Sequence, residues 1–258
     1  MDPYELPELL NQFALIPHFD DKIAELANLA EPEDWNYHQA LSDRPNPILF
    51  NYLRYTYTRI GQEKKVAVTK DEKWACWNTG LVTSHQEPIY VLFEENKFDD
   101  RQTYWHFNQF CRKGHYFLNK FSALPEMAHY FDDPAQLVFD SRKELRPNIQ
   151  HIIADNKERF PEPYRSMNDY SLQTFLKGAI DNAIERVKRN YKTAIPQYYK
   201  GSIQLLLPLC IGAADKADLA LVVDTYADFY RASTCLTLDM AYNNARQLAR
   251  PDRDWLQP

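Results

Sequence analysis

The chain has 258 residues, of which 45% are hydrophobic, and its formal net charge is −6. This composition allows a sizeable core and excludes a chain that is disordered throughout. Residues 1–45 hold ten acidic and two basic side chains and residues 46–258 hold 26 and 28, which excludes a generally basic nucleic-acid-coating protein but permits a local basic groove.

Apolar residues recur at helical spacing through residues 5–30, and a polar, proline-marked stretch follows. We therefore expect residues 1–45 to form an acidic helical cap or subdomain beside a core domain of residues 46–258. The next helix is predicted to begin at Pro47, because proline suits a first helical turn. Its buried face is predicted to consist of Leu49, Leu53, Thr56 and Ile60.

The pattern then changes to the alternation of β-strands. Strands are predicted at residues 64–70, 73–79, 88–96 and 103–113. In the stretch WNTGL, Gly80 is expected to supply a positive φ at a strand end or in a hairpin turn. In the last of these strands, alternation places His106 and Asn108 on the same face.

Helices are predicted at residues 120–131, 147–159 and 171–192, and strands at 202–209, 217–224 and 232–239. The apolar stripe of the longest helix is predicted to be Phe175, Ala179, Ala183, Val187 and Tyr191.

A final helix is expected to begin at Asp239 as its N-cap and to end before Pro251. The face that this helix turns to a sheet is predicted to contain Met240, Ala241, Ala245, Leu248 and Ala249. Strands, helices, more strands and a helix in this order predict an α+β fold, with antiparallel sheets, packed helices and a helical N-terminal segment.

Three clusters combine guanidinium, amide or hydroxyl groups in a way that suits a phosphate and a base. They lie in the final helix, in the helix that begins at Pro47, and in WNTGL. Surface ion pairs, a solvated helix face and a plain hairpin turn are the structural alternatives. The ligand-binding residues predicted for one common pocket are Asn51, Arg54, Tyr55, Asn78, Thr79, Asn108, Asn243, Arg246 and Arg250.

His106 is the best candidate for acid–base catalysis, although a histidine on a strand is more often structural. The sequence contains no Walker, GxGxxG, HExxH or GxSxG motif, and its four cysteines lack zinc-site spacing. We therefore predict neither a metal nor a cofactor, and leave open whether the protein is an enzyme. The absence of a signal peptide and of a long apolar run predicts a soluble, cytoplasmic protein without a membrane partner.

Four stretches resemble, in this order, the bacterial family called domain of unknown function 3825. They are PNPILFNYLRYTYTRI, WNTGLVT, RPNIQHIIADNKERFP and LTLDMAYNNARQLARPDRDWL, and they span about residues 40–258. The closing stretch, with Asn243 to Arg246 and Asp254 to Leu256, is the most specific. Family members resemble partners of cold-shock-like and other RNA-associated modules, so the resemblance implies an RNA-linked role but no catalytic residue.

The leading hypothesis is therefore a protein that binds single-stranded RNA or a nucleotide and is accessory to RNA metabolism or processing. One alternative is an enzyme that acts on a nucleotide or a phosphorylated small molecule, with His106 moving a proton. Another is a protein-interaction module whose acidic N-terminal helices recruit a basic partner.

Overall fold

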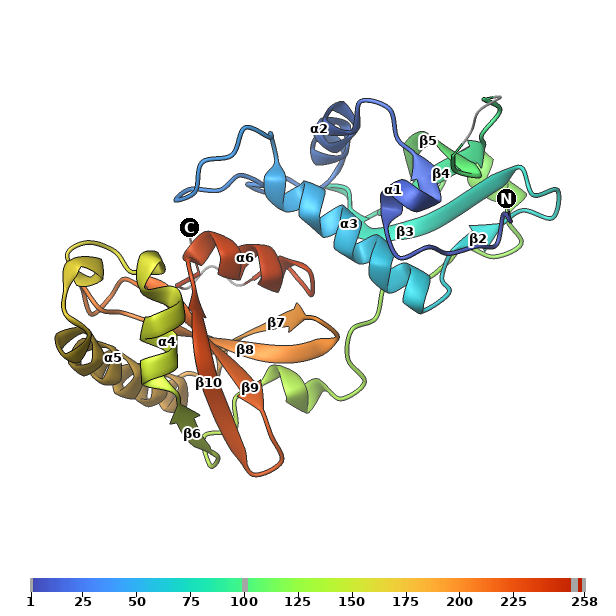
Figure 1. Ribbon diagram of the computed structural model, residues 1–258. Coiled ribbons are helices and arrows are strands. Elements are labelled where there is room, and N and C mark those ends of the chain that lie inside the picture. Colours follow the sequence, from blue (N-terminus) through green and yellow to red (C-terminus); the bar gives the residue numbers. More distant parts are fainter. Residues whose placement is uncertain (1, 99–101, 252–254, 257–258) are drawn as a thin grey trace. The chain divides into compact units, whose positions relative to one another are not determined.

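The computed structural model describes residues 2–98, 102–251 and 255–256. Contacts divide the chain into two compact units, residues 1–36 with 42–129 and residues 37–41 with 130–258. Each unit contains a five-stranded sheet (Figure 1). The predicted α+β fold is confirmed, although each sheet also has one parallel pair, β1 with β5 and β6 with β10.

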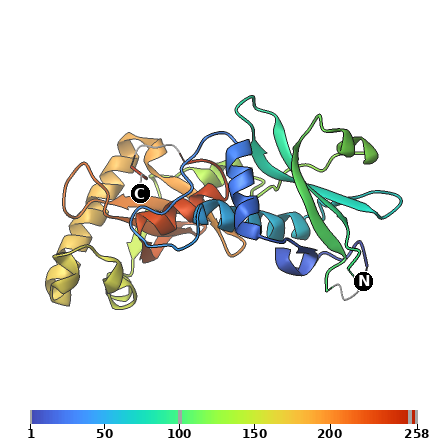
Figure 2. The same ribbon diagram turned by 90° about the horizontal axis from the view of Figure 1, so that it is seen from above.

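The sheet of the first unit has the strand order β1-β5-β4-β3-β2. Its strands are β1 (Ala14–Leu15), β2 (Ala67–Val68), β3 (Trp74–Val82), β4 (Pro88–Glu95) and β5 (Trp105–Arg112). Antiparallel pairing makes β3, β4 and β5 a meander, as the alternating pattern predicts, and Figure 2 shows its pronounced twist.

Helix α3 (Pro47–Gln62) packs on β3, and the four residues predicted for its buried face are all buried. The N-terminal segment contributes α1 (Leu10–Phe13) and α2 (Phe19–Leu29), which contact α3. Phe13 lies against Tyr57 and Phe93, with ring centroids 5.0 and 5.3 Å apart. Residues 1–36 therefore share the core of the first unit instead of forming a separate cap.

The WNTGL stretch forms a bulge inside β3, and not the end of a strand. The register with β4 shifts between Asn78 and Val82, and Gly80 has the predicted positive φ, 73°. The Tyr52 hydroxyl of α3 donates a hydrogen bond to the Thr79 carbonyl at 2.9 Å. A Cβ on Gly80 would lie 2.6 Å from that hydroxyl, so glycine lets α3 approach the sheet.

The prediction of a helix at residues 120–131 is wrong. The structure has only the short 3₁₀ helix η1 (Tyr116–Lys120) and irregular chain after it. Pro125 disfavours helical conformation at Leu124, and Phe121 and Leu124 pack on the sheet instead.

The sheet of the second unit has the strand order β6-β10-β9-β8-β7. Its strands are β6 (Glu144–Pro147), β7 (Ile195–Tyr199), β8 (Ser202–Leu209), β9 (Leu219–Thr225) and β10 (Phe229–Leu236). Helices α4 (Ile149–Asn156) and α5 (Asp169–Arg189) pack on one face, with alternate residues of β8 and β9 between them. Helix α6 (Leu238–Arg246) contacts β7, β9 and β10 (Figure 1). The connections contain the short 3₁₀ helices η2 (Pro134–Leu137), η3 (Lys157–Arg159), η4 (Tyr164–Ser166) and η5 (Tyr191–Thr193).

Helix α5 is present as predicted, and Ala179, Ala183 and Val187 of the predicted stripe are buried. Phe175 and Tyr191 are exposed, whereas Leu172, Leu176 and Ile180 are buried. The leucines and the isoleucine belong to the same buried cluster as the three predicted residues, so the periodicity predicts the centre of the buried face but not its full width.

The family stretch RPNIQHIIADNKERFP holds a bulge of β10 in place. The register of β10 shifts between Ala232 and Thr234. There the Asn156 side-chain oxygen accepts hydrogen bonds from the Thr234 hydroxyl and the Cys235 amide, both at 2.7 Å. Asn156 is buried, so its amide group satisfies backbone and hydroxyl groups that the bulge leaves unpaired.

No helix in the described part of the chain is both long and apolar enough to cross a membrane.

Candidate functional site

The N-cap of helix α6 is Thr237, and the prediction of Asp239 at that position is wrong. The Thr237 hydroxyl accepts from the Met240 amide at 3.4 Å. Asp239 lies in the first turn, is only 2% exposed and accepts from the backbone amides of residues 38–40 at 2.9, 2.7 and 2.7 Å. Its carboxylate therefore binds the segment 37–41 to the second unit.

The apolar face of α6 is only partly as predicted. Ala241 and Ala245 are buried, but Met240 is 40% exposed and Ala249 is also exposed. The buried face is completed by Tyr242, because the helix is rotated about its axis relative to the prediction.

Arg246 and Arg250 do not form a pair on one helical face. Helix α6 ends at Arg246, which is 8% exposed, whereas Arg250 lies beyond the helix and is exposed. Asn243 accepts a hydrogen bond from the Tyr37 hydroxyl at 3.4 Å. Asp254 of the closing stretch lies outside the described residues, and the Trp255 indole donates to the Thr193 carbonyl at 2.6 Å.

The predicted residues of α3 belong to the other unit. Arg54 and Tyr55 are exposed, Asn51 is half-buried, and the Arg54 guanidinium lies 5.3 Å from the ring centroid of Phe50. Because α3 is in the first unit and α6 in the second, a pocket shared by Arg54 and Arg246 stays a prediction.

Asn78 and Thr79 make their polar contacts within the fold. The Asn78 side-chain oxygen accepts from the Gly80 amide at 2.9 Å, and the Thr79 hydroxyl donates to the Ile89 carbonyl at 2.7 Å. Burial raises the pKa of Tyr90, while a hydrogen bond with Asn78 opposes that rise. These contacts stabilise the β3 bulge.

His106 and Asn108 do not occupy one regularly alternating face. Leu92 pairs with Gln109 and Phe93 with Phe107, so Asn108 is an extra residue in β5. A bulge of this kind interrupts the alternation, so His106, which pairs with Glu94, shares a face with Gln109, which pairs with Leu92. The ring centroids of His106 and Phe98 are 5.7 Å apart.

An exposed aromatic column lies where η1 crosses the sheet of the first unit. The rings of Tyr116 and Phe117 stack with centroids 4.2 Å apart, and those of Phe117 and Trp74 are 4.7 Å apart. Tyr116 is 65% exposed, and His115 adds a ring 4.8 Å from it. Phe117 and Trp74 pack against the buried cluster on this face. The outer rings of Tyr116 and His115 are therefore supported by side chains that the core holds in place.

One cation lies on this column, and two more precede it closely in the sequence. The Lys120 ammonium lies 4.1 Å from the ring centroid of Trp74, and Arg112 and Lys113 are exposed just before His115. Within the described residues, no carboxylate lies within ion-pair distance of these three cations. We call the whole set the aromatic–basic surface: Trp74, Arg112, Lys113, His115, Tyr116, Phe117 and Lys120.

A hollow of about 470 Å³ adjoins the aromatic–basic surface at His115. Its lining includes Arg112, Gly114 and Cys111, together with the carboxylate of Glu87. Burial raises the pKa of Cys111 to about 11, so this thiol is not an effective nucleophile at neutral pH. The hollow offers space beside the ring of His115.

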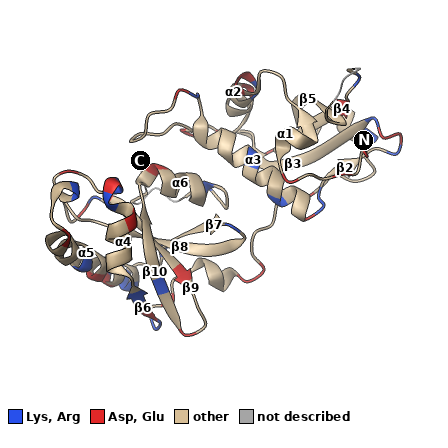
Figure 3. Cartoon of the chain, viewed as in Figure 1, with Lys and Arg blue, Asp and Glu red and all other residues tan. Residues whose placement is uncertain are grey.

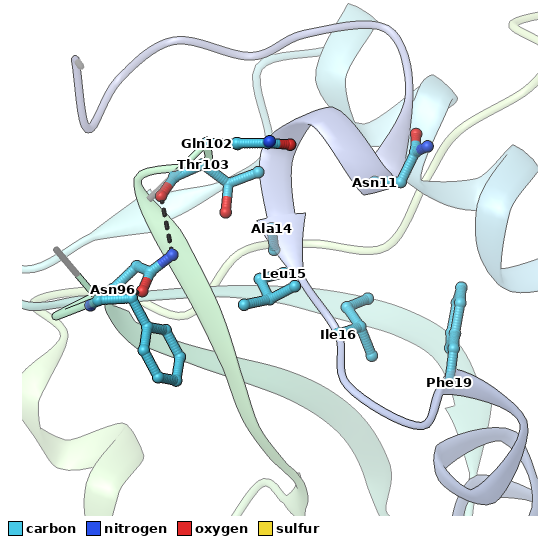
Figure 4. A pocket seen from close by; sticks show the side chains of 9 residues that line it. Asn11, Ala14, Leu15, Ile16, Phe19, Asn96, Gln102 and Thr103 are labelled. Carbon is cyan, nitrogen blue, oxygen red and sulfur yellow. Dashed lines mark hydrogen bonds between the residues drawn. The ribbon is translucent and has the colours of Figure 1, made fainter. Parts of the chain in front are cut away.

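A second hollow of about 470 Å³ is lined by Leu15, Ile16, Phe19, Phe98 and the amides of Asn11, Asn96 and Gln102 (Figure 4). The Asn96 amide donates to the Thr103 carbonyl at 3.1 Å, as the dashed line shows. None of the described residues that line this hollow carries a charge, so it suits a phosphate less well.

A row of polar side chains crosses the sheet of the second unit: Gln197, Gln204, Asp224, Arg231 and Arg146. Gln204 donates to Asp224 at 2.7 Å, and Arg146 pairs with Glu144 at 2.7 Å. Figure 3 shows basic residues on β6 and β10 beside an acidic one on β9. Because acidic and basic groups balance, this row is a weaker site for an anion than the aromatic–basic surface.

The aromatic–basic surface is not among the predicted sites, although the sequence carries a signal for it. Residues 102–125 contain no Asp or Glu, three Lys or Arg and seven Phe, Trp or Tyr. The net charge of the whole chain is negative and gives no sign of this segment. Trp74 is distant from it in the sequence and joins the same surface only because β3 pairs within the sheet.

Comparison with known proteins places the chain in a family. Residues 26–255 match the domain of unknown function DUF3825, so the match begins within α2, earlier than the resemblance in the sequence suggests. No curated protein and no solved structure gave a significant match. Since the matched region covers most of the sequence, the chain belongs to the DUF3825 family.

Proposed function

We propose that this chain binds single-stranded nucleic acid through the aromatic–basic surface of its first unit. The observation that supports the proposal is the column in which Tyr116, 65% exposed, lies on Phe117 with ring centroids 4.2 Å apart. Proteins bind single strands by stacking bases on aromatic rings and by placing cations along the backbone. Lys120, whose ammonium lies 4.1 Å from the ring centroid of Trp74, supplies a cation at the column, and Arg112 and Lys113 are exposed shortly before it in the sequence.

RNA is the polymer that we expect, because the family resembles partners of RNA-associated modules. An accessory role in RNA metabolism follows, in which the chain holds a strand without cleaving it. Arg54 and Tyr55 of α3 are exposed in the same unit and stay candidate contacts. Arg246 is a weaker candidate, because only 8% of it is exposed.

Replacing Tyr116 with alanine is expected to weaken RNA binding about 5- to 150-fold, since one stacked base contributes about 1–3 kcal/mol. Tyr191→Ala is the matched control, because Tyr191 is equally exposed, at 65%, but lies in the second unit. Fluorescence anisotropy of a labelled RNA of about 12 nucleotides measures both variants.

The proposal also predicts that affinity falls steeply between about 50 and 200 mM salt, because cations on the surface displace counterions from the strand. Equal affinities for Tyr116→Ala and Tyr191→Ala would remove the aromatic column from binding. A wild-type chain that fails to bind RNA at about 50 mM salt would disprove the function itself.

A further inference from the structure

We propose that Lys120 covers a stacking face of Trp74 and leaves it when a base binds, so that the surface holds a second base besides the one on Tyr116. The proposal rests on the proposed function and specifies its ligand as a single strand that presents separate, unpaired bases.

Lys120 contacts the rings of both Trp74 and Phe117. Its ammonium lies 4.1 Å from the ring centroid of Trp74 and 4.8 Å from that of Phe117. The two rings are tilted by 31° to each other. Lys120 therefore lies over both rings, where a flat aromatic ligand would otherwise have access to Trp74.

Whether Lys120 stays on Trp74 depends on how strong the contact between the cation and the ring is, compared with the stacking of a base on the same ring. A cation over an exposed ring changes an equilibrium by about two- to five-fold. A base stacked on an aromatic side chain changes binding by about 5- to 150-fold. A base therefore displaces the ammonium, and the long, flexible lysine side chain then reaches a phosphate of the same strand.

The backbone around Lys120 is anchored, so the movement is confined to the lysine side chain. Lys120 is the last residue of η1, and its side chain is exposed, whereas Leu118 and Phe121 anchor the segment in the buried cluster. The lysine can move while the backbone stays in place. A double helix offers no free base faces along its length, so the exchange selects single strands.

The experiment compares Lys120→Ala with Lys113→Ala, a neighbouring exposed lysine that precedes the rings. Binding of the labelled RNA is measured at about 50 mM and about 300 mM salt. Both variants are expected to bind more weakly at low salt, because each lacks a cation. At the higher salt, Lys120→Ala is expected to bind two- to five-fold more tightly than the wild-type chain, since no ammonium has to leave Trp74. Lys113→Ala is not expected to exceed the wild-type affinity at either salt concentration.

Tryptophan fluorescence supplies the second measurement. RNA is expected to quench the emission of the wild-type chain, and Trp74→Phe is expected to lose that change while the protein still binds through Tyr116. If Lys120→Ala binds more weakly than the wild-type chain at both salt concentrations, or if RNA leaves Trp74 emission unaltered, the exchange is disproved although RNA binding stands. If the wild-type chain binds no RNA, the proposed function fails and the exchange with it.

Discussion

Replacing Gly80 with alanine is expected to lower the free energy of unfolding of the first unit by about 2–3 kcal/mol. Gly80 has a φ of 73°, a conformation that costs an alanine about 1–2 kcal/mol. The added Cβ would lie 2.6 Å from the Tyr52 hydroxyl, so the hydrogen bond from Tyr52 to Thr79 is lost or distorted at a further cost of about 1 kcal/mol. Hydrogen exchange of peptides from β3, β4 and β5 measures this loss.

Gly178→Ala is the control for this substitution. Gly178 lies within α5 with no atom within 4 Å of an added Cβ, so alanine should stabilise the second unit by about 1 kcal/mol. Combining Gly80→Ala with Tyr52→Phe removes the clash, and the double variant should lose less stability than the sum of the two single variants. A Gly80→Ala chain as stable as the wild type would contradict the described bulge.

Replacing Asp239 with asparagine is expected to destabilise the second unit by about 2–4 kcal/mol, because hydrogen bonds to a charged acceptor are worth about 1.5–3 kcal/mol each. The Asp239 carboxylate accepts from three backbone amides of residues 38–40 and is buried. Asparagine would place its NH₂ donor opposite backbone amides, which are also donors and cannot accept a hydrogen bond from it. Hydrogen exchange should rise at residues 38–40 and in the peptides of β7 to β10.

The same substitution separates the observed role of Asp239 from that of a helix cap. Asparagine is as good an N-cap as aspartate, so a capping role predicts almost no change. Thr237→Ala, which removes the observed cap, should cost about 1 kcal/mol. If Asp239→Asn proves milder than Thr237→Ala, the binding of segment 37–41 by this carboxylate contributes little.

Much of the fold is predictable because its long elements carry strong local periodicity. The buried face of α3, the meander of β3 to β5 and the strands β8 to β10 all follow from such patterns. The parallel edge strands β1 and β6 are not predicted, because they have two and four residues and pair with strands distant in the sequence. The division of the chain is also missed, since segment 37–41 joins the second unit through contacts with Asp239.

The candidate site was harder to predict, because binding groups and structural groups use the same residue types. Asn78, Asn156 and Asp239 all lie in the stretches that resemble the family, and each satisfies backbone donors inside the fold. A bulge adds one residue and shifts every following side chain, which separates His106 from Asn108. Neither effect has a signature in a local pattern of polar residues.

The aromatic–basic surface depends on tertiary contacts. Tyr116 and Phe117 are neighbours in the sequence, but Trp74 belongs to a strand and contacts them only after the meander has formed. Sequence composition identifies a segment rich in aromatic and basic residues, and only the fold shows that these side chains stack.

Ultraviolet crosslinking of the full chain to a single-stranded RNA, with the attachment sites identified by mass spectrometry, tests the location of the binding surface most directly. The account predicts crosslinks at Tyr116, Phe117 and Trp74, and their loss when salt screens the neighbouring cations. Crosslinks confined to α3 and α6, at the exposed Tyr55 for example, would contradict it and favour the pocket of Arg54 and Arg246.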